Sequence, residues 1–245
     1  MKLSAIILSQ GEGSTQKAID SASFADEVVV ILDSSEKSSF QWSGNVKIVR
    51  HDLAGDFSQQ RNFGSSQAMG DWLLYLDADE TVSNKLQKEI EKALASSTEK
   101  NDAYYLKRRD FFWGHELRFG ETMTARDKGF VRLVKKNSGS WEGEVHERFV
   151  TKHRVGFLNG FIDHRPHQTI PEFLNSINYY SSVRAKELKN SNVRFSVFAM
   201  ILNPFGKFLY TYFLKLGFLD GAAGFVYSFM MSFHSFLSRA KLLNL

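Results

Sequence analysis

Hydrophobic and polar positions alternate along the first hundred residues in the manner of buried strands separated by helices. Four short apolar runs predict strands, at residues 3–8, 27–33, 45–50 and 71–77. Three other segments predict helices, at residues 15–25, 59–69 and 82–96. The last helix is the clearest, because Leu86, Ile90 and Leu94 recur every four residues and Ser83 can cap it. Alternating strands and helices favour an α/β fold with a parallel sheet.

The pattern changes after residue 100. Further strands are predicted at residues 103–107, 129–134 and 155–163, and loops rich in aromatic and charged residues join them. Long helices are then predicted at residues 172–188, 195–216 and 222–243. We therefore expect a mixed-sheet domain over residues 1–170, with a nucleotide-binding front over 1–100 and a substrate-binding back over 101–170, followed by a helical extension over 171–245.

Composition narrows the class of protein. The chain has 245 residues, 43% of them hydrophobic, and no cysteine. These values exclude disordered, collagen-like and disulfide-framework proteins, and they rule out a cysteine nucleophile or a thiolate metal site. The apolar start at residues 3–8 is shorter than the apolar core of a signal peptide, so we expect a buried strand there.

Charge and aromatic residues gather near the C-terminus. From Val183 onward there are eight basic residues against two acidic ones, and ten of the 22 phenylalanines follow residue 194. Because the basic residues are sparse among Phe and Leu, this split favours a membrane surface or a partner over nucleic acid, and we expect no nucleic-acid ligand. The apolar stripe that includes Phe225 and Phe229 is either core packing or an interfacial helical hairpin. We favour the hairpin, peripheral on the inner face of the cytoplasmic membrane.

The acidic pair Asp77 and Asp79 is the sharpest chemical signal. A buried strand delivers both carboxylates to its carboxyl end, the edge where open α/β sheets bind ligands. Two such carboxylates can share a hard divalent cation and leave room for phosphate oxygens. The alternative is an acidic turn that caps the following helix. Asp33 ends an earlier strand at the same edge, which favours the metal-diphosphate interpretation.

Several segments, taken together, resemble the family 2 glycosyltransferases, which have the GT-A fold. They are residues 3–12, Asp26-Glu-Val-Val-Val-Ile-Leu-Asp33, Gln60-Arg-Asn-Phe-Gly64 and Gly70-Asp-Trp-Leu-Leu-Tyr-Leu-Asp-Ala-Asp-Glu80. Three others, Arg132-Leu133, Val145-His-Glu-Arg148 and residues 217–225, resemble a bacterial subgroup that includes the lipopolysaccharide core β-1,4-glucosyltransferases. The resemblance implies a Rossmann-like nucleotide-sugar-binding domain.

The resemblance also assigns donor and metal residues. It implies that a UDP-sugar is the donor, bound by a set of residues that comprises Ser9, Glu12, Asp33, Arg61, Asp77 and Arg132. It implies that Mn²⁺ or Mg²⁺ is held against the diphosphate by Asp77, Asp79 and His164. For His164 the alternative is a structural histidine after a strand. Two loops depart from the family pattern, because Gly11 precedes Glu12 and Ser34-Ser-Glu-Lys37 follows Asp33.

Inversion at the anomeric carbon requires a general base. Glu147 is the first candidate, Glu144 the second and Glu142 the third, and His146 would position the acceptor or the base. The competing interpretation of Glu147 is an ion pair with its near neighbours in sequence, Arg148 or Lys152.

We therefore expect a metal-dependent, inverting enzyme that transfers a sugar, glucose by resemblance, to a sugar hydroxyl of a lipid-linked glycan such as lipopolysaccharide inner core. Transfer to a polyprenyl phosphate or a capsule intermediate is the nearest alternative. A non-catalytic membrane-surface protein on a degenerate GT-A fold is the other. The cluster Lys107-Arg-Arg109 either meets acceptor phosphates, covers the donor site as part of a loop, or is a solvated strand end.

Overall fold

The computed structural model describes residues 1–11, 13–33, 44–52, 56–96, 101–143, 147–167 and 169–245. The strands are β1 Leu3–Ser9, β2 Glu27–Asp33, β3 Val46–His51, β4 Trp72–Asp77, β5 Glu80–Val82, β6 Ala103–Phe112, β7 His115–Leu117, β8 Phe130–Lys135, β9 Gly139–Glu142, β10 Arg148–Thr151 and β11 Val155–His164. The α-helices are α1 Thr15–Ser21, α2 Phe57–Gln67, α3 Asn84–Ala95, α4 Met123–Asp127, α5 Ile170–Asn190, α6 Val197–Leu209 and α7 Gly221–Ala240.

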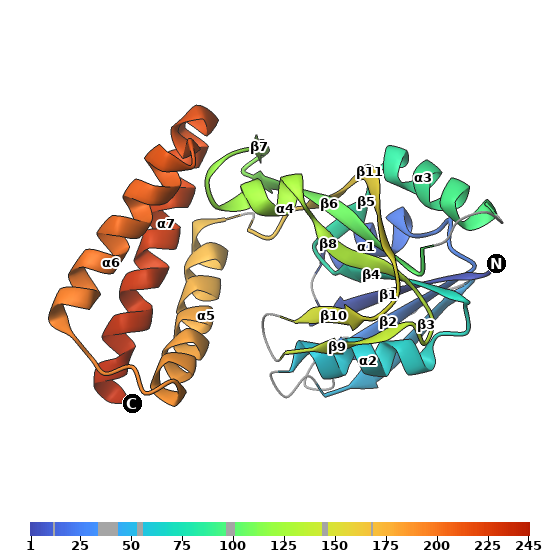
Figure 1. Ribbon diagram of the computed structural model, residues 1–245, viewed down its shortest axis with the longest axis horizontal. Helices are drawn as coiled ribbons and strands as arrows, with labels where there is room; N and C mark the ends of the chain where they lie inside the picture. Colours follow the sequence, from blue (N-terminus) through green and yellow to red (C-terminus); the bar gives the residue numbers. More distant parts are fainter. Residues whose placement is uncertain (12, 34–43, 53–55, 97–100, 144–146, 168) are drawn as a thin grey trace. The chain divides into compact units, whose positions relative to one another are not determined.

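Most strands form one mixed sheet (Figure 1). Its order in the described residues is β3-β2-β1-β4-β8-β6-β11-β5, and β7 pairs with β6. Strands β1 to β4 run parallel to one another, whereas β8 runs antiparallel to β4. The predicted α/β fold with a mixed sheet is confirmed, and β1 lies at the centre of the parallel half because it pairs with both β2 and β4.

The chain divides into two compact units. The first comprises Met1–Arg108 and Asp127–His164, and the second comprises Arg109–Arg126 and Arg165–Leu245. The second unit thus combines the predicted helical extension with the end of β6, β7 and α4, which precede it in sequence by about 40 residues or more.

The first unit buries apolar side chains on both faces of its sheet. Alternate residues of β1 face opposite ways, so Ile7 belongs to one apolar cluster and Ile6 to the other. The cluster around Ile7 includes Leu86 and Ile90 of α3, as the four-residue spacing predicts. Ser83 caps α3, since its side chain accepts a hydrogen bond from the backbone N–H of Leu86 at 3.3 Å. This two-sided core fixes the carboxyl ends of β1, β2 and β4.

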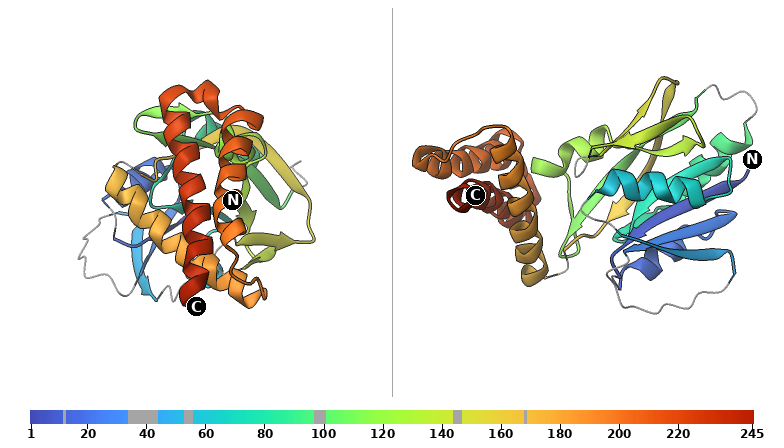
Figure 2. Two further views of the ribbon diagram at one scale, coloured as in Figure 1. Left: turned by 90° about the vertical axis from the view of Figure 1, so that its left-hand side faces the viewer. Right: turned by 90° about the horizontal axis from the view of Figure 1, so that it is seen from below.

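In the second unit α7 packs against both α5 and α6. Figures 1 and 2 show α7 between the other two helices. Its buried cluster joins Phe112 and Leu117 to Phe173 of α5 and to Ala223 and Met230 of α7. The prediction of three C-terminal helices is confirmed, although the middle one ends in a π-helical turn at Tyr210–Leu214.

Candidate active site

Three site residues predicted from the sequence lie at the same edge of the parallel half-sheet. Ser9 ends β1, Asp33 ends β2 and Asp77 ends β4. In the register of the sheet Leu8 lies opposite Asp77, and Ser9 lies opposite Leu32. Strand order reverses around β1, which makes this edge the topological switch point where open α/β sheets bind ligands.

Two arginines enclose the carboxylate of Asp77. Arg61 of α2 donates from Nη2 to Asp77 Oδ1 at 2.7 Å, and Arg132 of β8 donates from Nη2 to Asp77 Oδ2 at 2.9 Å. Both arginine side chains are buried. Burial acts to raise the pKa of Asp77, but the charges of Arg132 and Arg61 outweigh it and hold that pKa well below its ordinary range. Asp77 is therefore ionised at neutral pH.

Arg61 also reaches Glu147, the first candidate for the general base. Its Nε donates to Glu147 Oε1 at 3.0 Å, and its Nη2 lies 2.9 Å from the same oxygen. One guanidinium thus joins the end of β4 to the residue just before β10, 86 positions further along the chain from Arg61. The sequence had suggested Arg148 or Lys152 as competing ion-pair partners of Glu147. The observed partner is Arg61, which brings a donor-side and an acceptor-side candidate together.

Glu80 is the residue that the sequence prediction left without a role. It is fully buried, and its Oε2 accepts a hydrogen bond from the backbone N–H of Asp77 at 3.0 Å. Arg132 and Arg108 each place a guanidinium nitrogen 3.6 Å from Glu80 Oε1. Glu80 therefore holds the turn after β4 and orients Arg132. The available signal was its place at the end of the Asp77–Glu80 segment, where it begins the short strand β5.

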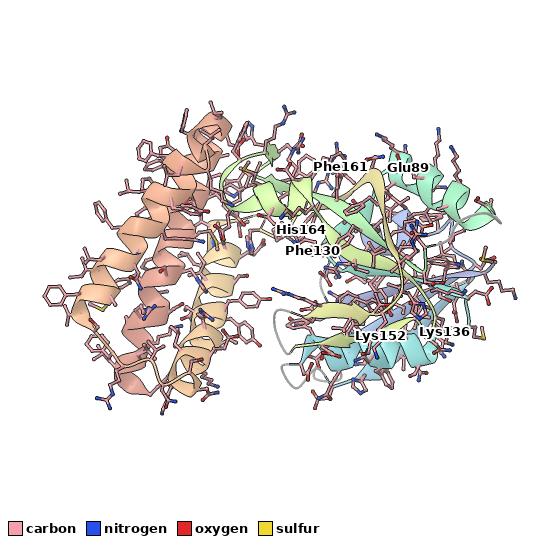
Figure 3. All side chains as sticks on the ribbon, viewed as in Figure 1. Glu89, Phe130, Lys136, Lys152, Phe161 and His164 are labelled. Carbon is pink, nitrogen blue, oxygen red and sulfur yellow. The ribbon has the colours of Figure 1, made fainter. Side chains whose placement is uncertain are left out.

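The second aspartate of the pair, Asp79, contacts the predicted third metal ligand. His164 at the end of β11 places Nε2 3.3 Å from Asp79 Oδ2, and Figure 3 labels His164 there. Burial acts to raise the pKa of Asp79, but the nearby His164 outweighs it and the pKa is lowered. One carboxylate and one imidazole are suitable ligands for Mn²⁺ or Mg²⁺. Among the described residues, however, no group of three or more such side chains is arranged to hold a metal ion.

The two residues that flank Arg61 in the Gln60-Arg-Asn62 segment anchor its helix. Gln60 donates from Nε2 to the backbone carbonyl of His51 at 2.8 Å. Asn62 donates to the Trp141 carbonyl at 2.9 Å and accepts from the Trp141 N–H at 3.0 Å. The Arg61 guanidinium lies 4.8 Å from the centre of the Trp141 ring. Residues of β3 and β9 thereby hold Arg61 in place.

The other predicted residues are placed as follows. The Ser9 hydroxyl lies 2.8 Å from the Thr15 hydroxyl and accepts from the backbone N–H of Gly11 at 3.0 Å, so it shapes the first turn. Glu142 is exposed in β9, opposite Arg148. Glu12, Glu144 and His146 lie outside the described residues.

The arginines retain capacity for an anionic ligand. The Nη1 atoms of Arg61 and Arg132 are buried, and within the described residues neither has a hydrogen-bond partner. A guanidinium can donate to carboxylate and phosphate oxygens with several N–H groups at once. The cluster of Asp77, Arg61, Arg132 and Glu147 thus combines donors for a phosphate with a carboxylate that can accept a proton.

Known proteins are similar to this chain over most of its length. An uncharacterized glycosyltransferase of Rickettsia typhi is 30% identical over 259 residues, which cover 100% of this chain and 87% of the relative. The lipopolysaccharide core biosynthesis glycosyltransferase LpsC of Rhizobium meliloti is 26% identical over 190 residues, which cover 76% of this chain and 68% of LpsC.

The chain is also similar to solved structures. The crystal structure of S. aureus TarS 1-349 in complex with UDP-GlcNAc covers 100% of this chain and 89% of that chain, with 14% identity and a TM-score of 0.48. The model of the family described as Glycosyl transferase family 2 matches residues 18–141, half of the chain, and this range contains α2, β4 and β8. Together with the full-length match to the R. typhi protein, this shows that the chain belongs to glycosyl transferase family 2.

Proposed function

We propose that this glycosyltransferase moves a sugar, glucose in our proposal, from a UDP-sugar to a sugar hydroxyl of a lipid-linked glycan such as lipopolysaccharide inner core, with inversion at the anomeric carbon. The observation that carries the proposal is the Arg61 bridge. It holds a carboxylate at the ligand-binding edge, Asp77, and a candidate base, Glu147, on one guanidinium at 2.7 and 2.9 Å. In our proposal the residue that binds the donor, Asp77, and the residue that activates the acceptor, Glu147, therefore contact the same arginine.

The donor side would use the edge formed by β1, β2 and β4. Asp33 at the end of β2 would contact the uracil or ribose, and Ser9 at the end of β1 and Glu12 would complete the donor site in our proposal. The Nη1 atoms of Arg61 and Arg132, which have no hydrogen-bond partner in the part of the chain that the structure describes, would donate to diphosphate oxygens and stabilise the charge that develops on the departing UDP. This role needs no rearrangement of β4, because both arginines already lie beside Asp77.

The residues present fit part of the coordination shell of a divalent cation. Asp79 and His164 would hold Mn²⁺ or Mg²⁺, with Asp77 as a further carboxylate. When bound, such an ion acts as a Lewis acid on the diphosphate. Asp77 already accepts hydrogen bonds from two guanidinium groups. In our proposal its carboxylate therefore contacts both the arginines and the metal ion.

On the acceptor side, Glu147 would take the proton of the attacking hydroxyl. Its side chain is mostly buried and is oriented by Arg61. Glu144 and Glu142 are the second and third candidates, and His146 would position the acceptor. A lipid-linked glycan as acceptor is supported by the name of the LpsC relative. Transfer to a polyprenyl phosphate is the alternative, and it would need little base because a phosphate is already ionised.

The test is UDP release by the purified protein with a panel of nucleotide sugars, with Mn²⁺ or Mg²⁺ and then with EDTA. Asp79→Ala is the test variant, and Asp71→Ala is its matched control at the opposite end of β4, where Asp71 accepts from the backbone N–H of Lys2 at 3.0 Å. We expect release from one UDP-sugar that EDTA and Asp79→Ala abolish and that Asp71→Ala retains. Release that survives both would show that the metal assignment is wrong. No turnover and no thermal shift with any donor would support the non-catalytic alternative.

A further inference from the structure

Among the described residues of the second unit, nothing covers one side of helix α6. None of its residues, Val197–Leu209, is buried. Its inner side packs on α7, where the ring centre of Phe208 lies 5.7 Å from that of Phe225. Neighbouring Tyr212 of the π-helical turn lies 5.6 Å from the same ring. Helices α5 and α6 both pack on α7, which lies between them in Figure 1, so α5 does not cover the other side of α6.

The uncovered side is apolar along its whole length. We define the outer stripe as Phe198, Leu202, Phe205, Leu209 and Phe213, which follow one another at intervals of three or four residues. All five are exposed, Phe198 to 79% and Phe205 to 69%. A contiguous apolar stripe of large side chains at this exposure marks an interaction surface.

The charge of the second unit identifies the kind of partner. That unit carries twelve Arg and Lys residues against six Asp and Glu residues. Its acidic groups are engaged within the unit: Asp220 accepts from the backbone N–H groups of Arg118 and Phe119, and Glu121 accepts from Lys207. The net positive charge favours an anionic surface and opposes the docking of a second copy of the same unit.

We propose that the outer stripe docks on an anionic phospholipid bilayer with α6 lying in the plane of the surface. This location goes beyond the proposed transfer reaction. An amphipathic helix with Phe and Leu on one side and basic residues around it binds such an interface by burying its apolar side between the headgroups and the acyl chains. Arg194 before α6 and Lys215 after the π-helical turn bracket the stripe with positive charge.

A transmembrane arrangement fits the contacts less well. Among the described residues, one segment, Val197–Leu214, is long and apolar enough to cross a membrane by length and composition. Within it, however, Lys207 donates to Glu121 at 2.7 and 2.8 Å, and the Pro204 carbonyl accepts from the Ser232 hydroxyl at 2.7 Å. Spanning would carry this ion pair and these polar groups into hydrocarbon, whereas in-plane docking leaves them on the inner side.

The first experiment measures flotation of the full chain with phosphatidylglycerol-containing vesicles and with phosphatidylcholine vesicles. The test variants are Phe198→Ser and Phe205→Ser, and Phe157→Ser is the matched control because Phe157 is 62% exposed on β11 of the first unit. We expect each test variant to weaken binding about tenfold or more, since burial of one Phe side chain is worth about a decade or more in partitioning. The control should bind as the unaltered chain does.

Salt and lipid charge test the electrostatic part. Raising the salt concentration and replacing phosphatidylglycerol by phosphatidylcholine should both weaken binding. Equal binding to both kinds of vesicle, or equal loss in Phe157→Ser, would overturn the proposal. Thermal unfolding and UDP release without vesicles should be unchanged in Phe198→Ser and Phe205→Ser, so a loss of binding is distinguishable from misfolding and from failure of the proposed reaction.

A second experiment uses the absence of cysteine from the chain. Phe205→Cys and Phe157→Cys can each be labelled at one site with an environment-sensitive fluorophore. We expect a blue shift with anionic vesicles for the label at position 205 and none at position 157. A shift that depends on protein concentration without vesicles would favour a second copy as the occupant and overturn the proposal. Retention on membranes after alkaline extraction would favour spanning, with the same consequence.

Discussion

At the scale of single residues, Arg61 joins two carboxylates of the candidate site. It pairs with Asp77 and Glu147 and lies over Trp141. A planar guanidinium can do this because its N–H donors diverge in fixed directions, which a lysine cannot reproduce. The position of the candidate base therefore depends on a helix that lies 86 residues earlier in the chain.

Replacing Glu147 by Gln tests the assignment of the base. The amide keeps the shape of the side chain but cannot accept the proton, so we expect kcat to fall by about 10²-fold or more with little change in the donor KM. Steady-state UDP release with saturating acceptor measures both constants. Glu142→Gln is the control, since Glu142 is exposed on β9. A larger loss in that variant would transfer the role of base to Glu142, and no loss in either would favour a phosphate acceptor.

Sequence reasoning named Asp77 and Asp79 from their place after a buried strand, and it named Arg61 and Arg132 from the resemblance to family 2 glycosyltransferases. It could not pair them, since Arg132 lies 55 positions from Asp77 and meets it only because β8 lies beside β4. Glu80 was overlooked for a related reason: its burial results from the β5–β11 pairing, in which it lies opposite His164. Contacts between segments that are far apart in the chain produce no hydrophobic periodicity, so a pattern analysis of the sequence does not detect them.

At the scale of elements, Gly160 of β11 marks where a strand meets a helix. A Cβ added there would lie 2.3 Å from Leu86 Cα and 2.6 Å from Leu86 N in α3. Figure 3 labels Glu89 and Phe161 at this junction, and the backbone N–H of Gly160 donates to Glu89 at 3.1 Å. Because a Cβ at position 160 would clash with the backbone of Leu86, only glycine lets β11 and α3 approach this closely.

We therefore expect Gly160→Ala to lower the free energy of unfolding by about 1–3 kcal/mol, because backbone atoms must move apart. Denaturant unfolding measures the change. Gly13→Ala is the control, since a Cβ at Gly13 meets nothing within 4 Å. Equal effects of the two substitutions would contradict the packing explanation.

The lowered pKa of His234 in α7 leads us to expect that the stability of the second unit depends on pH. Burial lowers its pKa, a backbone hydrogen bond with Tyr180 acts in the opposite direction, and the charges of Lys207, Arg184 and Lys241 lower it further. The unfolded chain, with a histidine pKa of about 6.5, then binds more protons than the folded one at acidic pH. This contribution to stability is present above that value and is lost as the pH falls below it.

Thermal unfolding between neutral and acidic pH tests this expectation. The chain should lose more stability on acidification than the variant His234→Gln, which cannot titrate in this range. His115→Gln, at an exposed position of β7, should behave like the unaltered chain. An identical pH dependence of the unaltered chain and His234→Gln would show that His234 does not limit stability.

Long elements were predictable and short ones were not. The strands that became β1, β2, β4 and β8 were predicted to within one residue, because runs of buried apolar residues are unambiguous. Strands β5, β7, β9 and β10 were overlooked, since three or four residues are too few for a recognisable pattern. Strand β6 continues five residues beyond its predicted end, to Phe112, and β7 pairs with the last three of them, Asp110–Phe112.

At the scale of the whole chain, a ligand that binds only the folded protein raises its stability. The proposed UDP-sugar with Mn²⁺ should raise the free energy of unfolding by about 2.7 kcal/mol at a concentration of 100 Kd. Differential scanning fluorimetry measures the accompanying rise in Tm. EDTA should reduce the rise, and Asp79→Ala should reduce it in the absence of EDTA as well. A rise of equal size without metal would assign donor binding to Arg61 and Arg132 alone.

Sequence reasoning did not predict the two compact units into which the chain divides. A boundary at residue 170 follows from the change from strands to helices, and it leaves residues 109–126 with the sheet. Their attachment to the helices depends on long-range groups, such as the Asp220 carboxylate that accepts from Arg118 and Phe119. The boundary at residue 170 stays a prediction about where the catalytic domain ends. The two compact units, in contrast, are defined by the contacts between residues.

The Arg61 bridge also has a consequence for folding kinetics. Its partners lie 16 and 86 residues away, so the half-site with Asp77 can assemble from α2 and β4, whereas the half-site with Glu147 must wait until the segment before β10 has docked. Closing such a loop has a large entropic cost and slows folding. Until it closes, an arginine and a glutamate that end up buried remain hydrated. We therefore expect the Arg61–Glu147 pair to form late, after the parallel half of the sheet.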